Sequence, residues 1–473
     1  MAIVAKLKEK LNTSRSTMDM TKGSPFSLIV RFALPLFLSQ TFQQLYNTAD
    51  SLIVGRSLGT NSLAAVSSSG NLIFLLVSFF YGISMGAGVV ISRYFGAGDR
   101  DRVSRTIHTD VAFGLVAGGV LTAVGVFLTP QILVWMNTPA DVLPEATGYL
   151  RTYFSGSLAF VMYNICTGIM NALGDSRRPL VYLIFSSLMN VVLDLLFVAG
   201  FGWGAWAAGL ATVISQASSV VFCFVHLMKK GEIFTVSVKK VRFHADLLKE
   251  IVKYGLPAGI QNSVIGFANV IVVSQINSFG KIATAGFGTH AKIEGFTFIP
   301  IVSFNMAITT YISQNLGAKE YDRAKKGAKI GILIPVAIAE AIGVVSYFIA
   351  PYMIALFDSS PDVIALGTSQ TRIVALFYFL LAFSHSVASI CRGAGKAIVP
   401  MTVMLSVWCV FRILYIFTVK QLFNDVHLIY WAYPITWAIS SVIYLIYYFK
   451  SDWVHGFENK REGLFHRAQS PHN

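Results

Sequence analysis

Two acidic side chains lie in stretches of sequence that are otherwise strongly apolar, and each has polar neighbours at helical spacing. Asp50 follows Tyr46 by four residues and Asn47 by three, and Asp194 follows Asn190 by four. Residues three or four apart share one face of a helix, so each carboxyl group has hydrogen-bonding side chains within reach. Burial disfavours the charged form of a carboxyl group and hydrogen-bond donors favour it. Such a group can therefore take up and release a proton or Na⁺ as its surroundings change.

The composition places these acids in a membrane. Of the 473 residues, 55% are hydrophobic and only 13% are charged, and the mean hydropathy is +0.63. Such a chain has too little polar surface to cover a water-soluble globule. Stretches of about 20 apolar residues, the length that crosses about 30 Å of hydrocarbon, are centred near positions 40, 82, 117, 160, 189, 216, 264, 300, 338, 376, 408 and 438. We expect an all-α integral membrane protein with twelve transmembrane helices.

The sequence repeats itself at an offset of about 221 residues. Three pairs of segments match: Phe-Ala-Leu-Pro at 32–35 with Tyr-Gly-Leu-Pro at 254–257, Gly96-Ala97 with Gly317-Ala318, and Gly174 and Pro179 with Gly395 and Pro400. The spread of these matches along each half predicts duplication of a whole six-helix unit. Because each copy has an even number of spans, both enter the membrane in the same direction. The two lobes should then be related by a pseudo-two-fold axis along the membrane normal.

The duplication and the charge pattern together predict the domain organisation. The expected parts are a cytoplasmic N-terminal segment (1–25), an N-terminal six-helix lobe (26–228), a cytoplasmic linker (229–248), a C-terminal six-helix lobe (249–450) and a cytoplasmic tail (451–473).

The net charge of +14 follows the predicted topology. Basic residues gather before the first span, around the mid-chain connection and after the last span, so the positive-inside rule places both termini in the cytoplasm. The excess then serves topology and contact with anionic lipids, and no nucleic-acid partner is expected. Residues 1–25 lack the apolar stretch of a cleavable signal peptide. We expect a multi-pass protein of the plasma (inner) membrane.

The repeat offers an internal comparison for the acids. The positions equivalent to Asp50 and Asp194 in the second copy are Ile271 and Tyr415. A carboxyl group needed only to build the fold should have kept a similar partner in the sister lobe, so the comparison favours a functional role. A purely structural role remains open, because buried polar clusters also cross-link membrane helices.

The residues around these acids resemble a known family. The runs Leu34-Pro35, Tyr46-Asn47-Thr48-Ala49-Asp50, Asn171-Ala172-Leu173-Gly174-Asp175 and Gly209-Leu210-Ala211-Thr212 are similar to the first and the fourth to sixth spans of the multidrug and toxic compound extrusion (MATE) family. The resemblance extends from about residue 25 to 450 and implies a polyspecific efflux pump coupled to H⁺ or Na⁺. No further cofactor is implied.

The resemblance also implies which residues bind the coupling ion. In the DinF-like branch of the family, the corresponding positions here are Asp50, Tyr46, Asn190, Asp194 and Thr212. If the ion is Na⁺, then Asp50, Asp194 and Asn190 would hold it. The NorM-like branch adds acids to the C-terminal lobe, where this chain has Gln261 and Asn262 in the seventh span and no acid in the tenth.

Other polar residues at bilayer depth are candidates for the substrate path. These are Asn47, Asn164, Gln261, Asn262 and Glu294. Two alternatives stay open for Glu294: contact with substrate or cation, or an ion pair with a residue such as Arg412. His385 is equivalent to Asn164 in the repeat, which favours a shared interhelical hydrogen bond. Pro35 is a candidate hinge, because a proline removes one helix hydrogen bond.

Together these observations favour an antiporter that exports amphipathic, often cationic, drugs or toxic metabolites by alternating access. H⁺ is favoured over Na⁺ as the coupling ion, and a monomer in contact with membrane lipids is expected. An enzyme is not expected, because the G-x-S-x-G run from Gly82 to Gly86 lies in an apolar span and indicates a close-packing seam. The alternatives are a flippase for lipid-linked oligosaccharides, from the same wider superfamily, and a membrane channel or scaffold.

Overall fold

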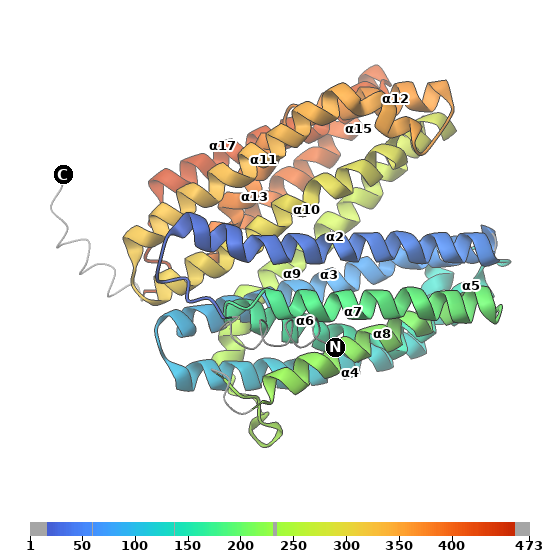
Figure 1. Ribbon diagram of the computed structural model, residues 1–473. Coiled ribbons are helices and arrows are strands. Elements are labelled where there is room, and N and C mark those ends of the chain that lie inside the picture. The colour runs from blue at the N-terminus through green and yellow to red at the C-terminus, as the bar shows by residue number, and fades with distance from the viewer. Residues whose placement is uncertain (1–16, 59, 137, 230–233, 459–473) are drawn as a thin grey trace, which may run out of the picture. The chain divides into compact units, whose positions relative to one another are not determined.

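The computed structural model describes residues 17–58, 60–136, 138–229 and 234–458, and within these ranges the chain forms helices and no β-strand (Figure 1). The predicted all-α fold is confirmed. Residues 1–16 of the predicted N-terminal segment, 230–233 of the linker and 459–473 of the tail lie outside the described residues.

The helices of each half follow one another through short connections. The first half contains α2 (Pro25–Leu58), α3 (Thr60–Gly96), α4 (Arg100–Trp135), α5 (Leu143–Ser155), α6 (Ser157–Ala172), α7 (Arg177–Asp194), the π-helical turn η1 (Leu195–Gly200) and α8 (Ala205–Leu227). After the short 3₁₀ turn η2 (Val238–Lys240), the second half contains α9 (Ala245–Asn277), α10 (Lys281–Gly317), α11 (Tyr321–Ala355), α12 (Pro361–Ala375), α13 (Tyr378–Gly393), α14 (Ile398–Met404), the π-helical turn η3 (Leu405–Phe411), α15 (Arg412–Phe423), α16 (Val426–Tyr430) and α17 (Ala432–Lys450).

The helix boundaries carry the internal repeat. Helices that begin at residues 60, 100, 157, 177 and 205 have counterparts that begin at 281, 321, 378, 398 and 426, so the offset is 221 in each case. The sequence matches therefore mark duplication of a complete helical unit, as predicted.

In each half, the helix expected as the fourth span of that half is interrupted. Among the described residues, ten helical segments are long and apolar enough to cross a membrane, and an eleventh is formed if α12 and α13 are taken together across a bend of 53°. Their counterparts α5 and α6 are separated by Gly156, and α6 is apolar but short. The chain is thus a multi-pass membrane protein, and the twelfth span stays a prediction.

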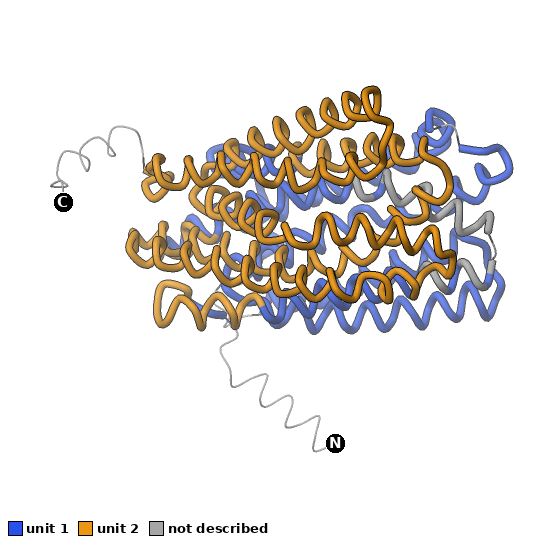
Figure 2. The backbone as a smooth tube through the Cα atoms, turned by 90° about the horizontal axis from the view of Figure 1, so that it is seen from above, with its two compact units in different colours: residues 1–19, 34–91, 99–259 blue, residues 20–33, 92–98, 260–473 orange. Residues whose placement is uncertain are grey.

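Packing divides the chain into two compact units (Figure 2). Unit 1 comprises residues 1–19, 34–91 and 99–259, and unit 2 comprises residues 20–33, 92–98 and 260–473. The long helices α2, α3 and α9 each contribute residues to both units. The lobe and linker boundaries predicted from the sequence stay a prediction.

The G-x-S-x-G run forms a close-packing seam within unit 1, as predicted. A Cβ atom at Gly82 would lie 2.3 Å from the backbone nitrogen of Gly259, and one at Gly86 would lie 2.2 Å from the Cα atom of Gly255. Small residues let two membrane helices approach this closely. The seam joins α3 to α9, and the serine of the run has no nucleophile-elbow turn around it because it lies inside α3.

Gly86→Leu is expected to destabilise the protein by at least about 2 kcal/mol, because the new side chain must displace backbone atoms of α9. Thermal unfolding in detergent measures the loss. Gly119→Leu is the matched control, since Gly119 lies on α4 with no atom within 4 Å of an added Cβ. Equal unfolding midpoints for the two variants would show that the seam is not tightly packed.

The turn after α3 and its counterpart after α10 use the same left-handed backbone with different residues. Gly98 has φ of 73°, and Lys319, 221 residues later, has φ of 60°. An L-residue with a side chain adopts this conformation at a cost of about 1 kcal/mol, whereas glycine adopts it freely.

Lys319→Gly is therefore expected to stabilise the protein by about 1 kcal/mol, and Gly98→Ala to destabilise it by a similar amount. Paired unfolding measurements on the two variants test this. A loss of stability in Lys319→Gly would show that the lysine side chain contributes more than its backbone strain costs.

Candidate functional site

Three helices of unit 1 supply a group of buried and half-buried polar side chains. Tyr46 and Asp50 lie on α2, Asn190 and Asp194 on the last turns of α7, and Thr212 on α8, which packs against α7. Asp194 is 0% exposed and Asn190 is 1% exposed. The α-helix changes to the π-helical turn η1 directly after Asp194, and such π segments occur frequently at functional sites.

The two carboxyl groups of this site face each other. Asp50 and Asp194 are close enough to interact, and the Tyr46 side chain interacts with both acids. Among the described residues, no lysine, arginine or histidine is found among the groups that act on either acid. Repulsion between two carboxylates disfavours a charge on both at once, so the pair favours binding one proton or one monovalent cation.

The side chains of this site offer more hydrogen-bond acceptors than donors. The Asn190 amide donates to Thr212 Oγ1 at 3.4 Å, and the Thr212 hydroxyl donates to the carbonyl oxygen of Ala208 at 3.0 Å. Both oxygens of Asp194, Oδ1 of Asp50 and Oδ1 of Asn190 are buried and have no hydrogen-bond partner among the described residues. Buried polar atoms are normally satisfied. A proton on one acid, or a bound cation, would supply what these oxygens lack.

The structure thus brings together all five residues that the sequence suggested for the coupling site: Tyr46, Asp50, Asn190, Asp194 and Thr212. Their role in binding an ion stays a prediction. Among the described residues, no group of three or more histidine, cysteine or acidic side chains could hold a metal ion.

Two polar residues of unit 1 were missed in the sequence. Gln216 lies one turn after Thr212 on α8, is 5% exposed and interacts with Tyr46. Asp110 on α4 is 1% exposed, and its Oδ1 atom has no hydrogen-bond partner among the described residues. The repeat held the signal for Asp110, because its counterpart in the second copy is Gly331.

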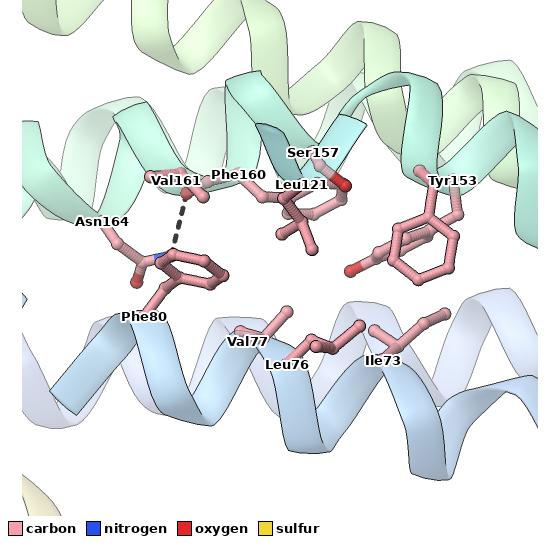
Figure 3. Close-up of a pocket in the computed structure, with 11 residues that line it drawn as sticks. Ile73, Leu76, Val77, Phe80, Leu121, Tyr153, Ser157, Phe160, Val161 and Asn164 are labelled. Carbon is pink, nitrogen blue, oxygen red and sulfur yellow. Dashed lines mark hydrogen bonds between the residues drawn. The ribbon is translucent and has the colours of Figure 1, made fainter. Parts of the chain in front are cut away.

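The substrate-path candidates of unit 1 are Asn47 and Asn164. Asn47 is exposed on α2. Asn164 lines a pocket between α3, α4 and α6, where its amide faces Phe80 and Val77 across a mainly apolar space (Figure 3). The pocket also contains Tyr153 and Phe160, whose rings stack with centroids 4.5 Å apart.

The hydrogen bond predicted for Asn164 and His385 is wrong. The Asn164 amide donates to the carbonyl oxygen of Phe160 on its own helix at 2.9 Å. Nε2 of His385 has no partner among the described residues, and its ring packs edge-on against Phe298 and Trp408. Asn164 and His385 are thus equivalent in the repeat, but they do not form the same hydrogen bonds.

The remaining candidates, Gln261, Asn262 and Glu294, belong to unit 2. The Gln261 amide lies 2.8 Å from the sulfur of Met404, and Asn262 is half-buried on α9.

An ion pair with Arg412 was one of the two alternatives for Glu294, and the structure shows an attraction without direct contact. The Arg412 guanidinium donates to Thr436 Oγ1 at 2.8 Å and lies 4.5 Å from the ring centre of Tyr433. Glu294 lies instead 4.0 Å from Nε2 of His290, on its own helix. The two charges still attract each other at longer range, and this attraction partly offsets the cost of burying Glu294.

Comparison with known proteins gives a consistent result across the chain. A family model described as MatE matches residues 35–196 and 257–418, one segment in each half. The probable multidrug resistance protein YoeA of Bacillus subtilis is 27% identical over 441 residues, which cover 91% of this chain and 95% of that protein. The multidrug export protein MepA of Staphylococcus aureus (strain MSSA476) is 21% identical over 376 residues, which cover 79% and 83%.

Solved structures share the fold. A MATE solved in complex with MaL6 superposes with a TM-score of 0.86 at 21% identity, covering 92% of this chain and 98% of that one. A MOP superfamily transporter from Pyrococcus furiosus, whose structure was described as showing a binding pocket of reversed polarity, superposes with a TM-score of 0.87 at 20% identity, covering 93% and 98%.

Asp194→Asn is expected to raise the stability of the protein by about 1 kcal/mol, because the amide removes a buried carboxyl group that lacks hydrogen-bond donors. Thermal unfolding in detergent near neutral pH measures the gain, and the exposed Asp141→Asn is the control. A clear loss of stability would show that the carboxyl group contributes to the fold through partners of its own.

Proposed function

Because the chain belongs to the MatE family, we propose that it is an antiporter of the plasma membrane that exports amphipathic, often cationic, small molecules in exchange for H⁺. The names of relatives such as YoeA and MepA, which describe multidrug resistance and multidrug export, support this class of substrate. We place the chain in the DinF-like branch, since its buried acid pair lies in unit 1.

One observation carries the proposal. Asp50 and Asp194 face each other, no basic side chain among the described residues acts on them, and their buried oxygens lack hydrogen-bond donors. A protonated carboxyl group has an O–H that can donate a hydrogen bond to an oxygen of the other carboxyl group. A single H⁺ therefore removes a charge and satisfies two oxygens. Na⁺ held by Asp50, Asp194 and Asn190 is the alternative, and it would use the same oxygens as ligands.

Loading and unloading of this site drives transport by alternating access. When a proton binds, the local charge is lost and the hydrogen bonds of Tyr46 and Asn190 rearrange. Pro35 lies 15 residues before Asp50 on α2, where the missing hydrogen bond allows the helix to bend. One charge moving through about 100 mV supplies about 2.3 kcal/mol, which supports roughly fifty-fold accumulation if coupling is complete.

The substrate wall fits amphipathic aromatic cations. The chain contains 36 phenylalanines, 19 tyrosines and 13 methionines, which offer dispersion and cation-π contacts. Asn47, Asn164, Gln261, Asn262 and Glu294 stay candidates for polar contacts along the path. We further propose that the protein works as a monomer with both termini in the cytoplasm, in contact with anionic lipids.

A lipid-linked oligosaccharide flippase remains the rival function. It would need basic side chains to hold a pyrophosphate, whereas the acid pair of unit 1 has no described cation beside it. Transport of a lipid-linked sugar without transport of cationic dyes would favour the flippase.

Asp50→Asn is expected to abolish dye efflux driven by an imposed pH gradient, because an amide cannot carry the proton. The measurement is dye efflux from proteoliposomes whose pH and sodium gradients are set independently. Asp101→Asn is the control, since Asp101 is an exposed acid paired with Arg105 at 2.9 Å.

The same experiment identifies the coupling ion. Efflux with a pH gradient alone supports H⁺, and efflux with a sodium gradient alone would replace H⁺ by Na⁺ in this proposal. Gradient-driven efflux that persists in Asp50→Asn would show that coupling does not run through this residue.

A further inference from the structure

A stripe of buried polar side chains runs along α8, away from the acid pair. Thr212, Gln216, Ser219, Cys223 and His226 are spaced by four, three, four and three residues, so they share one face of the helix. Each is at most 9% exposed. The stripe covers about 21 Å along the axis, which is most of the depth of the hydrocarbon core.

The stripe begins at the acid pair. Gln216 interacts with Tyr46, which interacts in turn with Asp50 and Asp194. Further along, the Ser219 hydroxyl donates to the carbonyl oxygen of Tyr182 on α7 at 3.2 Å.

The other end reaches the first turn of α7, which the charge pattern predicts to be cytoplasmic. There, Arg178 Nη1 lies 2.7 Å from Nε2 of His226 and 3.1 Å from a carboxylate oxygen of Asp175. Asp175, Arg178 and His226 line a small pocket open to the surface, together with Thr17 and Phe234. A polar surface site therefore terminates the stripe.

A further buried acid, Asp110, lies on α4. Asp110 and Cys223 of the stripe both act electrostatically on Cys166 of α6, which lies between them in the packing order. The three helices pack in the same order, α4 on α6 and α6 on α8. Asp110 lies about 15 Å along α4 from Arg100 at the predicted cytoplasmic end.

Oδ1 of Asp110 and Oε1 of Gln216 are buried without a hydrogen-bond partner among the described residues. The same holds for Oδ1 of Asn171 on α6 and Oγ of Ser187 on α7, two helices that pack against α8. A cluster of unsatisfied polar atoms in one seam is the usual environment of bound water, because each water can serve two to four such groups.

We propose that this seam, formed by the polar face of α8 with Asp110, is the route by which the proton leaves the acid pair toward the predicted cytoplasmic side. Water bound along the seam receives the proton from the acid pair, which regains its negative charge. Asp110 accepts the proton and passes it on, so that its carboxylate is regenerated, and the pocket at His226 and Arg178 delivers it to solvent. The inference rests on the proposed antiport.

The test is substrate-driven proton movement in proteoliposomes that contain a pH-sensitive dye. Asp110→Asn is expected to slow proton movement by at least about tenfold, while the equilibrium affinity for a cationic dye stays within about twofold of wild type. Asp110→Glu, which keeps the carboxyl group, should restore much of the rate. Asp101→Asn, which removes an exposed acid from the same helix, should match wild type.

The outcomes separate this inference from the proposed function. If wild type moves protons and Asp110→Asn moves them equally fast, the seam is not the route and the antiport proposal stands. If Asp110→Asn loses both dye affinity and the rate of proton movement, and Asp110→Glu does not restore them, then Asp110 has a structural role. If wild type moves no protons, proton coupling and the seam both fail.

Discussion

A carboxyl group in the interior of a membrane is costly unless its charge is removed or balanced, and the two units of this chain meet that constraint differently. In unit 2, Glu294 lies near His290 and feels the attraction of the buried Arg412. In unit 1, Asp50 and Asp194 face each other with no described cation beside them. Arg412 offsets part of the cost of burying Glu294, and no described basic side chain does the same for the acid pair.

The two units therefore differ in counter-charge. Glu294 is partly offset by Arg412, whereas the acid pair has no such partner among the described residues. In the proposed function, this lack of a counter-charge is what allows the pair to exchange an ion. Duplication kept the helix boundaries at an offset of 221 residues, while the buried acids Asp50, Asp110 and Asp194 acquired no acidic counterparts in the second copy.

Much of this architecture could be predicted from the sequence, because hydropathy and the repeat depend on local composition. The all-helical fold, the duplication and the proximity of Tyr46, Asn190 and Thr212 to the acids all follow that logic. The broken fourth spans did not, since a hydropathy window averages across Gly156 and its counterpart Phe377. The bonding of Arg412 and His385 also could not be foreseen, because it depends on side chains such as Thr436 and Trp408 from other helices.

Asp110 was overlooked for a related reason. It follows the cluster of charges between Arg100 and Arg105, so hydropathy suggests an exposed acid, and the only hint of burial is its counterpart in the repeat, Gly331. Only the packing of α4 on α6 shows that this carboxyl group is removed from water.

The connection between the acid pair and the rest of the molecule follows from the path of α2. This helix changes from unit 2 to unit 1 between Ala33 and Leu34, next to Pro35, and then carries Tyr46 and Asp50 to the acid pair. A rearrangement at Asp50 therefore acts on a helix whose first residues belong to the other unit. α9 repeats the arrangement, since it changes unit after Gly259, two residues beyond Pro257, but it carries no acid at the position equivalent to Asp50. In the proposed function, the ion-dependent change therefore begins on one of the helices that contribute residues to both units.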